Sequence, residues 1–558
     1  MRITISLADA LRRFRNEAHV RVLWADALCI NQKDNGERAS QVQLMGLIYF
    51  KAHRVRIWFG QDDEPTYRAC HAASLVKKFA HPYRSRLGIT ARDVSEELFR
   101  QHKDSENLYW AALHRLLERA WFKRVWVVQE LGLSRRATFY CGETQFTRDE
   151  LYDFVLLLEH SKTGLLVSYD IDLRMLKLGR RYHQATWGSG RIELGSDPVE
   201  AETFLDILST TRGLKYTDDR DTIYAFLGHP SAFKQHRLDD SPYHWYPQNY
   251  YDSRTAILVP SYETFNTFSK TCTDLAISAI QNRGIGLEVL AHVAHDDTTI
   301  AQNVPSWAPI WTMTKQAAHF HQYNVHYAAS GVLRQIPPDI HIPIGGVCTS
   351  RLSLRALRLG TIRFATTEPG TLSVETLVET LFPERVAGAA YLKMHALDWP
   401  DATSRSRDSY NDWSALAMTL TAGLITTDVD LAPGPAEKHL TRHVHGMESY
   451  LRRYERGPPQ IQSSEDDDIA EYFHMDLGRA AQSRVFYVTF NNRFGLAPMI
   501  AQEGDQVWLP LGTKMPFVLR PLSEAVYKIL GQTYLHGLMH GEAIKNKTES
   551  AFRTIVLC

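Results

Sequence analysis

The stretch LWADALCINQKDNGERASQVQLMGLIYFKAHRVRIWFG (residues 23–60) decides the fold class of the first part of the chain. Residues 20–28 are rich in β-branched and aromatic side chains, which predicts a short buried strand ending at Asp26. Apolar residues then recur at helical spacing, which predicts a helix over about 38–52 (Val42, Met45, Tyr49 and Ala52). Residues 54–60 (RVRIWFG) predict a second strand. Two strands joined by a helix indicate an α/β unit.

The same alternation continues along the next ninety residues. A second apolar stripe predicts a helix (Leu113, Leu116, Leu117 and Ala120), and residues 121–134 predict its continuation to a stop near Gly132. Residues 137–142 predict a third strand, so the three strands should form one mainly parallel, helix-covered sheet. We expect an α/β domain over 1–145, a mainly helical region over 146–345 and a β-rich region over 346–558.

Composition narrows the class of protein. The 558 residues carry 63 basic and 63 acidic side chains, so no overall charge favours nucleic acid or an anionic membrane. The six cysteines are scattered without a CxxC pair, which indicates reduced thiols rather than disulfides or a zinc ribbon. The longest uncharged apolar stretch, 413–427, is shorter than the ~20 residues that a spanning helix needs. We expect a soluble, cytoplasmic protein with no nucleic-acid or membrane partner.

Five segments, read in order, resemble the fungal heterokaryon-incompatibility (HET) family. They are residues 23–60, RAWFKRVWVVQELGLSRRATFYCG (119–142), YTDDRDTIYAFLG (216–228), VPSWAPIW (304–311) and the run 504–543. Family members usually open with an aromatic-Ser-Tyr-x-Trp-Gly strand before the helix that resembles residues 7–15. This sequence starts almost at that helix. We therefore expect a sheet that lacks its first strand and has an open edge, or an edge filled by a strand from the C-terminal half.

The HET family is in turn similar to Toll/interleukin-receptor (TIR) domains, which implies a flavodoxin-like parallel sheet. Residues 121–131 (WFKRVWVVQEL) resemble the TIR segment whose glutamate serves the NAD-cleaving members, and Glu130 is the matching position. The resemblance thus implies NAD as a substrate rather than a bound cofactor. Cleavage of the nicotinamide–ribose bond passes through an oxocarbenium-like species that one carboxylate can stabilise. Trp126 precedes Glu130 by four residues, so an aromatic wall beside a carboxylate is expected. Glu130 as an ion-paired surface residue is the competing interpretation.

Residues near the first predicted strand are the candidate ligand-binding set. Asp26 stands where open α/β sheets bind ligands, and Asn31 and Gln32 follow in the same loop. Each also has a structural interpretation, because Asp and Asn side chains commonly bond to turn backbone. Asp34 and Glu37 have the spacing of a capping box. We expect no metal ligands: His536 and His540 are four apart, but HGLMHGE lacks the HExxH order.

The resemblance implies an effector of self/non-self recognition that triggers programmed cell death through its N-terminal domain. Three mechanisms stay open at this point. The domain is an NAD glycohydrolase with Glu130 as its catalytic carboxylate, a non-catalytic module that self-associates to signal to an unidentified incompatibility partner, or a degenerate inactive paralogue.

Overall fold

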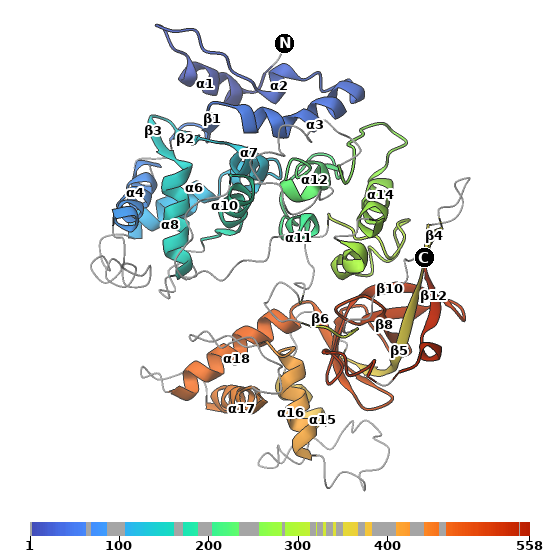
Figure 1. The fold of residues 1–558 in the computed structure, drawn as a ribbon. Helices are drawn as coiled ribbons and strands as arrows, with labels where there is room; N and C mark the ends of the chain where they lie inside the picture. Colours follow the sequence, from blue (N-terminus) through green and yellow to red (C-terminus); the bar gives the residue numbers. More distant parts are fainter. Residues whose placement is uncertain are drawn as a thin grey trace. The chain divides into compact units, whose positions relative to one another are not determined.

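The structure is a computed structural model, and it divides the chain into two compact units, Met1–Ser278 and Ala279–Cys558. It describes residues 3–62, 69–85, 107–160, 171–187, 203–233, 256–281, 285–312, 320, 327–330, 339–341, 350–366, 374–381, 409–424, 440–456, 465–545 and 547–558. A small sheet lies in the N-terminal part, helices dominate the middle, and a larger sheet occupies the C-terminal part (Figure 1). The chain is therefore a mixed α/β protein, as predicted.

The N-terminal sheet has three described strands in the order β1–β2–β3. β1 (Val55–Trp58) pairs in parallel with β2 (Ala137–Cys141), with Val55 opposite Ala137. β2 then turns back through Gly142, whose φ of 51° suits glycine, into the antiparallel β3 (Thr144–Thr147). The predictions of strands at 54–60 and 137–142, and of their parallel pairing, are confirmed. Among the described strands only β2 pairs with β1, so the other edge of β1 is open.

The prediction of a strand over residues 20–28 is wrong. Residues 20–25 are extended but belong to no sheet, and residue 26 begins a short helix, α2 (Asp26–Cys29). The side chains of Val20 and Val22 are 98% and 94% exposed. A strand forms only when a neighbour satisfies its main-chain groups and covers a face, whereas β-branched composition expresses a preference for that environment. No described strand supplies it here.

The helix that links this segment to β1 forms as predicted. α3 spans Asn35–Lys51 and buries Val42, Met45, Gly46 and Leu47. Asp34 caps its N-terminus, because Oδ1 accepts the main-chain N–H groups of Gly36 at 2.9 Å and of Glu37 at 3.0 Å. The reciprocal half of the expected capping box differs: Glu37 accepts the N–H of Asn31 at 2.9 Å instead of that of Asp34. The cap therefore also anchors the preceding loop.

Replacing Asp34 with alanine is expected to lower the free energy of unfolding by about 1 kcal/mol, because two main-chain donors of α3 lose their acceptor. Asp34→Asn, which keeps a side-chain oxygen, should cost only a few tenths of that amount. Chemical denaturation of both variants measures the difference. Equal stability of the alanine and asparagine variants would contradict the capping role.

Two short helices replace the single helix predicted over 113–132. α6 (Asn107–Leu117) is followed by a 3-10 turn, η2 (Ala120–Lys123), and then by α7 (Val127–Leu133). Between η2 and α7 the main chain pairs with another segment, since Val125 N–H donates to the carbonyl of Lys215 at 3.0 Å. α1 (Ile5–Phe14) packs on the sheet through Phe14, whose ring lies 4.9 Å from that of Tyr140.

Helices fill the rest of the first unit. α7 packs against α3 and α10, and α4 against α6 and α8 (Figure 1). The remaining elements of this unit are α4 (Ala69–Ser85), α8 (Arg148–His160), α10 (Arg174–Trp187), α11 (Phe204–Thr210), α12 (Asp221–Tyr224) and η3 (Pro230–Ala232), and the unit boundary falls within α14 (Phe268–Gln281). The helical middle region predicted from the sequence is confirmed.

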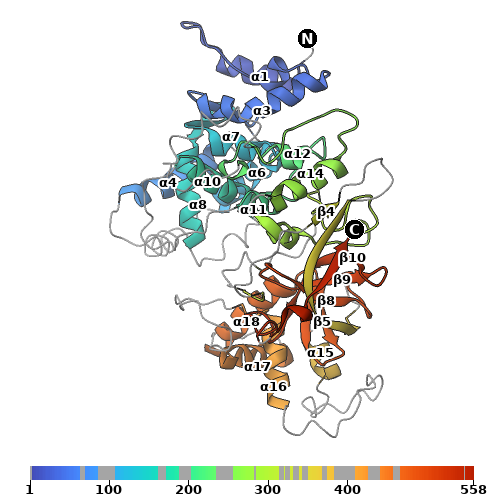
Figure 2. The same ribbon diagram turned by 45° about the vertical axis from the view of Figure 1, so that its right-hand side comes forward.

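The second unit contains a closed ring of five strands, in the order β5–β8–β9–β10–β12 and back to β5. β5 is long enough to belong to two sheets, because its second half leaves the ring after a register shift near Gly360 and pairs with β6. In both views β5, in yellow, runs along the red strands of the ring (Figures 1 and 2). The bounds are β5 (Arg351–Ala365), β6 (Arg484–Thr489), β7 (Phe494–Pro498), β8 (Gln506–Pro510), β9 (Phe517–Pro521), β10 (Val526–Gln532), β11 (Tyr534–Leu535) and β12 (Arg553–Leu557).

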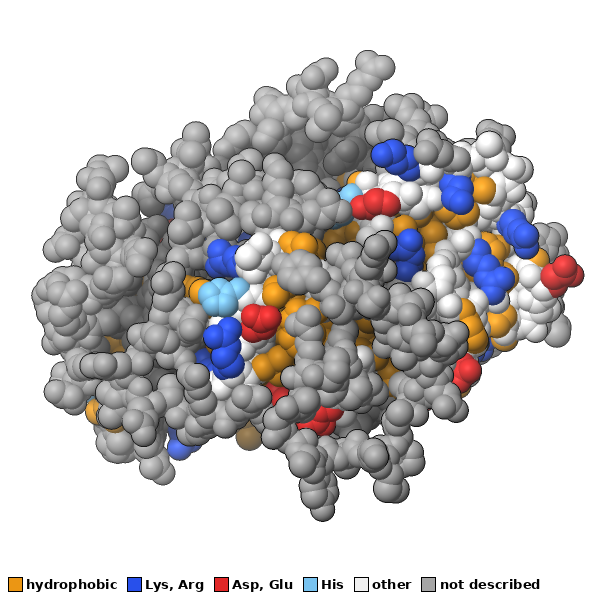
Figure 3. All heavy atoms as spheres, turned by 90° about the horizontal axis from the view of Figure 1, so that it is seen from below, with side chains coloured by type: hydrophobic (Ala, Val, Ile, Leu, Met, Phe, Trp, Pro, Cys, Tyr) orange, Lys and Arg blue, Asp and Glu red, His pale blue; other side chains and the backbone are white. Residues whose placement is uncertain are grey.

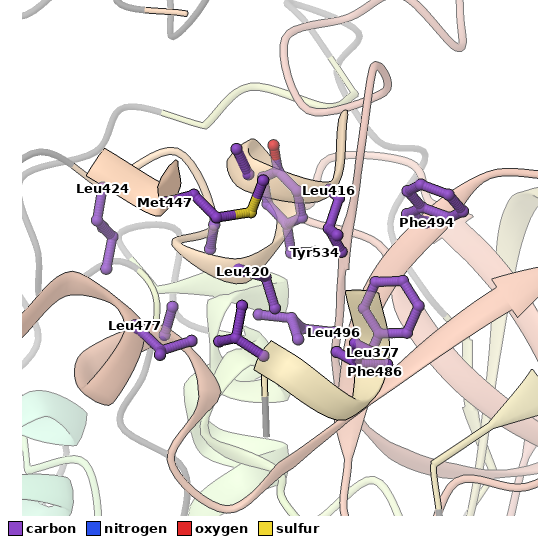
Figure 4. Packing of buried hydrophobic residues seen from close by; sticks show 14 of the residues in the cluster. Leu377, Leu416, Leu420, Leu424, Met447, Leu477, Phe486, Phe494, Leu496 and Tyr534 are labelled. Atoms are coloured by element: carbon purple, nitrogen blue, oxygen red, sulfur yellow. The ribbon is translucent and has the colours of Figure 1, made fainter. Parts of the chain in front are cut away.

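Four helices of the second unit cover the β6–β7–β11 side with one apolar core. Leu416 and Leu420 from α16 meet Phe486 of β6 and Leu496 of β7 (Figure 4). These helices are α15 (Val374–Leu381), α16 (Ser409–Leu420), α17 (Leu440–Arg456) and α18 (Glu465–Ala481), and the unit also holds η4 (Gly286–His292), η9 (Glu549–Ala551) and β4 (Asp339–His341). The C-terminal region is therefore β-rich with a helical cover.

Residues 304–311, one of the segments that resemble the HET family, tie into the ring. Ser306 accepts the N–H of Ile529 at 3.0 Å and donates to the carbonyl of Cys558 at 2.5 Å.

Seen from below, hydrophobic, basic and acidic side chains of described residues share one face (Figure 3). No helix among the described residues is long and apolar enough to cross a membrane.

Candidate functional site

Glu130 lies half-buried on α7, next to the sheet. One carboxylate oxygen, Oε2, accepts the indole N–H of Trp121 at 3.3 Å. Trp121 is itself fixed, because its ring packs on Phe59 at 5.3 Å and on Phe139 at 5.7 Å at the end of β1 and in β2. The other oxygen, Oε1, accepts no hydrogen bond from the described residues. The sheet thus positions a carboxylate with one engaged and one available oxygen.

The electrostatics of Glu130 combine burial with charges of both signs. Removal from water raises the pKa of Glu130, and the guanidinium of Arg124 opposes that rise. The nearby carboxylate of Asp26 raises the pKa of Glu130 further, while the Trp121 N–H lowers it. A carboxylate with a raised pKa is a stronger base and a stronger hydrogen-bond acceptor than an exposed one.

A tyrosine from α3 completes the cluster. Burial raises the pKa of the Tyr49 hydroxyl, and the charges of Glu130 and Asp26 raise it further. The ring of Tyr49 also contacts Trp24 of the extended segment, with centroids 5.9 Å apart. We call these six residues the Glu130 cluster: Trp24, Asp26, Tyr49, Trp121, Arg124 and Glu130. They come from α2, α3, η2, α7 and the segments between them.

Asp26 lies in a different secondary-structure element from the one that the sequence predicted. It begins α2 instead of ending a strand, and its Oδ1 accepts the N–H of Ala27 at 2.7 Å. Its side chain is exposed, yet its charge acts on Glu130. The strand that was expected to place Asp26 is therefore absent, and a ligand-binding role for Asp26 stays a prediction.

Asn31 and Gln32 lie in the turn that follows α2. Asn31 Oδ1 accepts the N–H of Lys33 at 3.3 Å, which is the turn-forming role of the structural interpretation. Gln32 is exposed in the same turn. Within the described residues neither side chain makes a hydrogen bond or ion pair with Glu130. Their assignment to a ligand site stays a prediction.

Trp126 points to a different carboxylate. Its indole N–H donates to Asp221 Oδ2 at 3.4 Å, whereas Trp121 donates to Glu130. The aromatic neighbour of Glu130 in this structure is thus Trp121, nine residues earlier, rather than the helix-spaced Trp126. The break between η2 and α7 explains the difference, because Trp126 caps α7 and does not lie within a continuous helix.

Asp221 is the centre of a second, buried network, which we call the Asp221 network (Arg38, Trp126, Asp218, Arg220, Asp221 and Tyr262). The hydroxyl of Tyr262 donates to Asp221 Oδ1 at 2.5 Å, and Arg38 lies 3.6 Å from Oδ2. The Arg38 guanidinium stacks on the Tyr262 ring at 3.5 Å. Burial raises the pKa of Asp221, and its hydrogen bond from Tyr262 and the charge of Arg38 oppose this. These hydrogen bonds, ion pairs and ring contacts connect α3, α7 and α12, so the network has a structural role.

The same three helices approach one another closely at glycine. A Cβ on Gly228, just after α12, would lie 2.4 Å from the side-chain nitrogen Nε2 of Gln129 and 3.2 Å from the Cα of Gly46. The side chain of Gln129 is 1% exposed. The HET-like segments 23–60, 119–142 and 216–228 therefore converge on α7, the helix that carries Glu130.

Sequence reasoning missed Trp121, Tyr49 and the Asp221 network. Trp121 and Tyr49 were within the quoted segments, but aromatic residues at helical spacing indicate core packing more often than a site. Asp221 was in the third segment, but the sequence did not show that its side chain is buried. Tyr262 lies in no recognisable motif. Within the described residues no group of His, Cys, Asp and Glu side chains is arranged to hold a metal ion.

His229, directly after Gly228, gives this region a pH dependence. Burial lowers the pKa of His229 to about 3, and its Nδ1 caps η3 by accepting the N–H of Ser231 at 3.1 Å. An unfolded chain takes up this proton near pH 6.5 but the folded chain does not, so stability falls as pH falls below 6.5. We expect a loss of roughly 1 kcal/mol between pH 6.5 and 5.5 from this residue.

The variant His229→Asn keeps a capping oxygen and removes the titration. Its stability, measured by denaturation at both pH values, should fall by roughly 1 kcal/mol less than that of the unmodified protein. His183, whose pKa burial lowers to about 4, contributes with the same sign in both proteins and cancels in the comparison. An unchanged pH slope would contradict a neutral, buried His229.

Comparison with known proteins agrees with this arrangement. Residues 1–130 match the family model of the heterokaryon incompatibility protein (HET), and residues 438–555 match that of the Het-6 β-barrel domain. The heterokaryon incompatibility protein 6, OR allele, of Neurospora crassa is 24% identical over 624 aligned positions, which cover 97% of this chain and 85% of the relative. No solved structure matches the chain. One end of the chain thus matches the HET model, the other end matches the Het-6 β-barrel model, and the Neurospora relative is similar across both, which together support a fungal heterokaryon incompatibility protein.

Proposed function

We propose that the protein is an effector of heterokaryon incompatibility whose HET domain triggers cell death in the cytoplasm by cleaving NAD, with Glu130 as the catalytic carboxylate. The name of the Neurospora relative supports the biological role. The observation that carries the enzymatic part is the Glu130 carboxylate, half-buried, fixed through one oxygen by Trp121 and flanked by Asp26 and Tyr49. Half-burial, a fixed orientation and an available oxygen are what a carboxylate needs to act on a bound ribose.

In this proposal nicotinamide leaves from C1′ of the ribose with the bonding electrons, and water adds to the same carbon and loses a proton. The products are nicotinamide and ADP-ribose. Glu130 stabilises the positive charge that develops on the ribose ring, and its Oε1 accepts a ribose hydroxyl. Asp26 is exposed beside it and is suited to a second hydroxyl. A TIR-type, flavodoxin-like sheet is part of the proposal, supported by the parallel β1–β2 pair.

Purified full-length protein tests the enzymatic part directly. Incubation with NAD should release nicotinamide and ADP-ribose in equal amounts, at a rate proportional to protein concentration, and chromatography resolves both products. A preparation that is folded by circular dichroism and releases no nicotinamide above the buffer rate would contradict the enzymatic mechanism.

One observation favours a non-catalytic alternative. Val20 and Val22 are almost fully exposed, and among the described strands β1 has one open edge, which suits a module that works by self-association or by docking an incompatibility partner. In that case cell death would proceed with the NAD level unchanged. A degenerate, inactive protein would produce neither effect.

A further inference from the structure

The main-chain groups of the extended segment 20–24 are not paired with other main-chain groups among the described residues. Within the described residues none of its N–H or C=O groups is hydrogen-bonded to another protein group. Its apolar side chains reach solvent, with Val20, Val22 and Leu23 at 98%, 94% and 39% exposed. An extended, unpaired backbone with exposed β-branched side chains is the form in which a strand accepts another strand.

A hollow of about 440 Å³ lies between this segment and α1. Its lining includes the apolar residues Leu11, Phe14 and Val20 and the basic residues Arg15, His19 and Arg21. The guanidinium of Arg21 donates to the carbonyl of Phe14 and so holds the segment beside the C-terminal end of α1. The hollow is therefore both apolar and basic.

The charge around this surface is mainly positive. Arg12 is exposed on α1, Arg15 is exposed directly after it, and Arg54 is exposed just before β1. Burial lowers the pKa of Arg56, Tyr140 opposes this, and the positive charges of Arg21 and Arg54 lower it further. Of the acidic neighbours, Asp9 is paired with Arg12 at 2.8 Å and Glu143 with Arg13 at 3.2 Å, and Glu17 and Asp26 are exposed. The excess of positive charge is local, because the whole chain is neutral.

We propose that residues 20–24 and the adjoining hollow bind an extended, acidic segment of another protein, which pairs main chain to main chain with residues 20–24. Alternate apolar side chains of that segment would enter the hollow, and its carboxylates would face Arg15 and Arg21. A second copy of this chain is the wrong occupant, because a two-fold interface would bring the same arginines face to face.

The proposal does not rest on NAD cleavage. The surface consists of α1 and residues 20–24, and a partner there would be recognised whether or not Glu130 is catalytic. It does name a chemistry for the incompatibility partner: an exposed strand or tail in which acidic and apolar residues alternate.

The test uses the full-length protein and a fluorescein-labelled peptide of four Glu-Val repeats, followed by fluorescence anisotropy at low salt. We expect saturable binding that weakens as salt increases. A peptide of four Lys-Val repeats should not bind. A peptide of four Glu-Pro repeats has the same charge but lacks half of the main-chain donors, and should bind at least tenfold more weakly.

Three variants locate the site. Arg15→Glu and Val22→Asn change exposed side chains that make no hydrogen bond, so both should fold normally and bind the Glu-Val peptide at least tenfold more weakly. Lys545→Glu, an exposed charge reversal in the second unit, should bind like the unmodified protein.

Binding that survives Arg15→Glu and Val22→Asn would overturn the proposal, as would equal binding of the Glu-Pro peptide. So would self-association that Val22→Asn abolishes, because the occupant would then be a second copy. Binding to phosphatidylserine vesicles in place of the peptide, lost in Arg15→Glu, would identify a membrane surface and also overturn it.

Discussion

Replacing Gly132 with alanine is expected to destabilise the first unit by about 2–3 kcal/mol, although alanine is the better helix former. Gly132 lies in α7, where Tyr182 of α10 packs against it. A Cβ there would lie 2.4 Å from Cγ and 2.8 Å from Cβ of Tyr182. The Tyr182 side chain is 1% exposed, and the overlap involves the base of that side chain rather than its tip, so it cannot move aside cheaply.

Gly478, in the interior of α18, is the matched control because a Cβ added there would meet nothing within 4 Å. Gly478→Ala should therefore stabilise the protein by up to about 1 kcal/mol, the gain that helix propensity alone gives. Calorimetry of both variants separates packing from propensity through the sign of the change. A Gly132→Ala protein that is as stable as the control would show that α7 and α10 do not pack this closely.

The second large effect is on activity. Glu130→Gln is expected to reduce nicotinamide release more than a hundredfold, since it removes the charge that stabilises the ribose cation and keeps the length of the side chain. Stability should be unchanged or slightly higher. Burial raises the pKa of Glu130, so the ionised carboxylate is unfavourable in the folded state and the neutral amide is not.

Glu118→Gln is the control for this effect. Glu118 is 51% exposed, pairs with Lys123 across η2, and lies in the same part of the chain as Glu130. Its replacement should change neither activity nor stability by more than a few tenths of a kcal/mol. An equal loss of activity in both variants would mean that charge in this region, rather than the Glu130 carboxylate, matters.

The sequence predicted those elements whose stability is local or whose partners lie within the chain. α3 carries its own cap at Asp34 and its own apolar stripe. β2 is buried along its whole length, and β1 buries every second residue, Val55 and Ile57. Residues 20–24 have the same β-branched character as β1, but the described chain offers them no strand neighbour. Composition therefore could not distinguish a strand from an extended surface segment.

The candidate site was predicted in part for a similar reason. Asp26 was predicted because polar residues near strand ends indicate a site, and Glu130 because residues 121–131 resemble the TIR segment. The contribution of Trp121 depends on the interruption of the helix between η2 and α7, which turns Trp126 toward Asp221. That break follows from main-chain pairing with Lys215, a contact ninety residues away that local periodicity does not contain.

The most direct test of the central claim is made in cells. Yeast expressing the full-length protein, Glu130→Gln or Glu118→Gln from an inducible promoter would be followed for NAD content and viability in the same culture. We predict that NAD falls before viability does with the unmodified protein and with Glu118→Gln, and that Glu130→Gln cells keep both. Cell death with an unchanged NAD level would contradict the enzymatic account, and NAD loss that persists in Glu130→Gln would assign the chemistry to another residue.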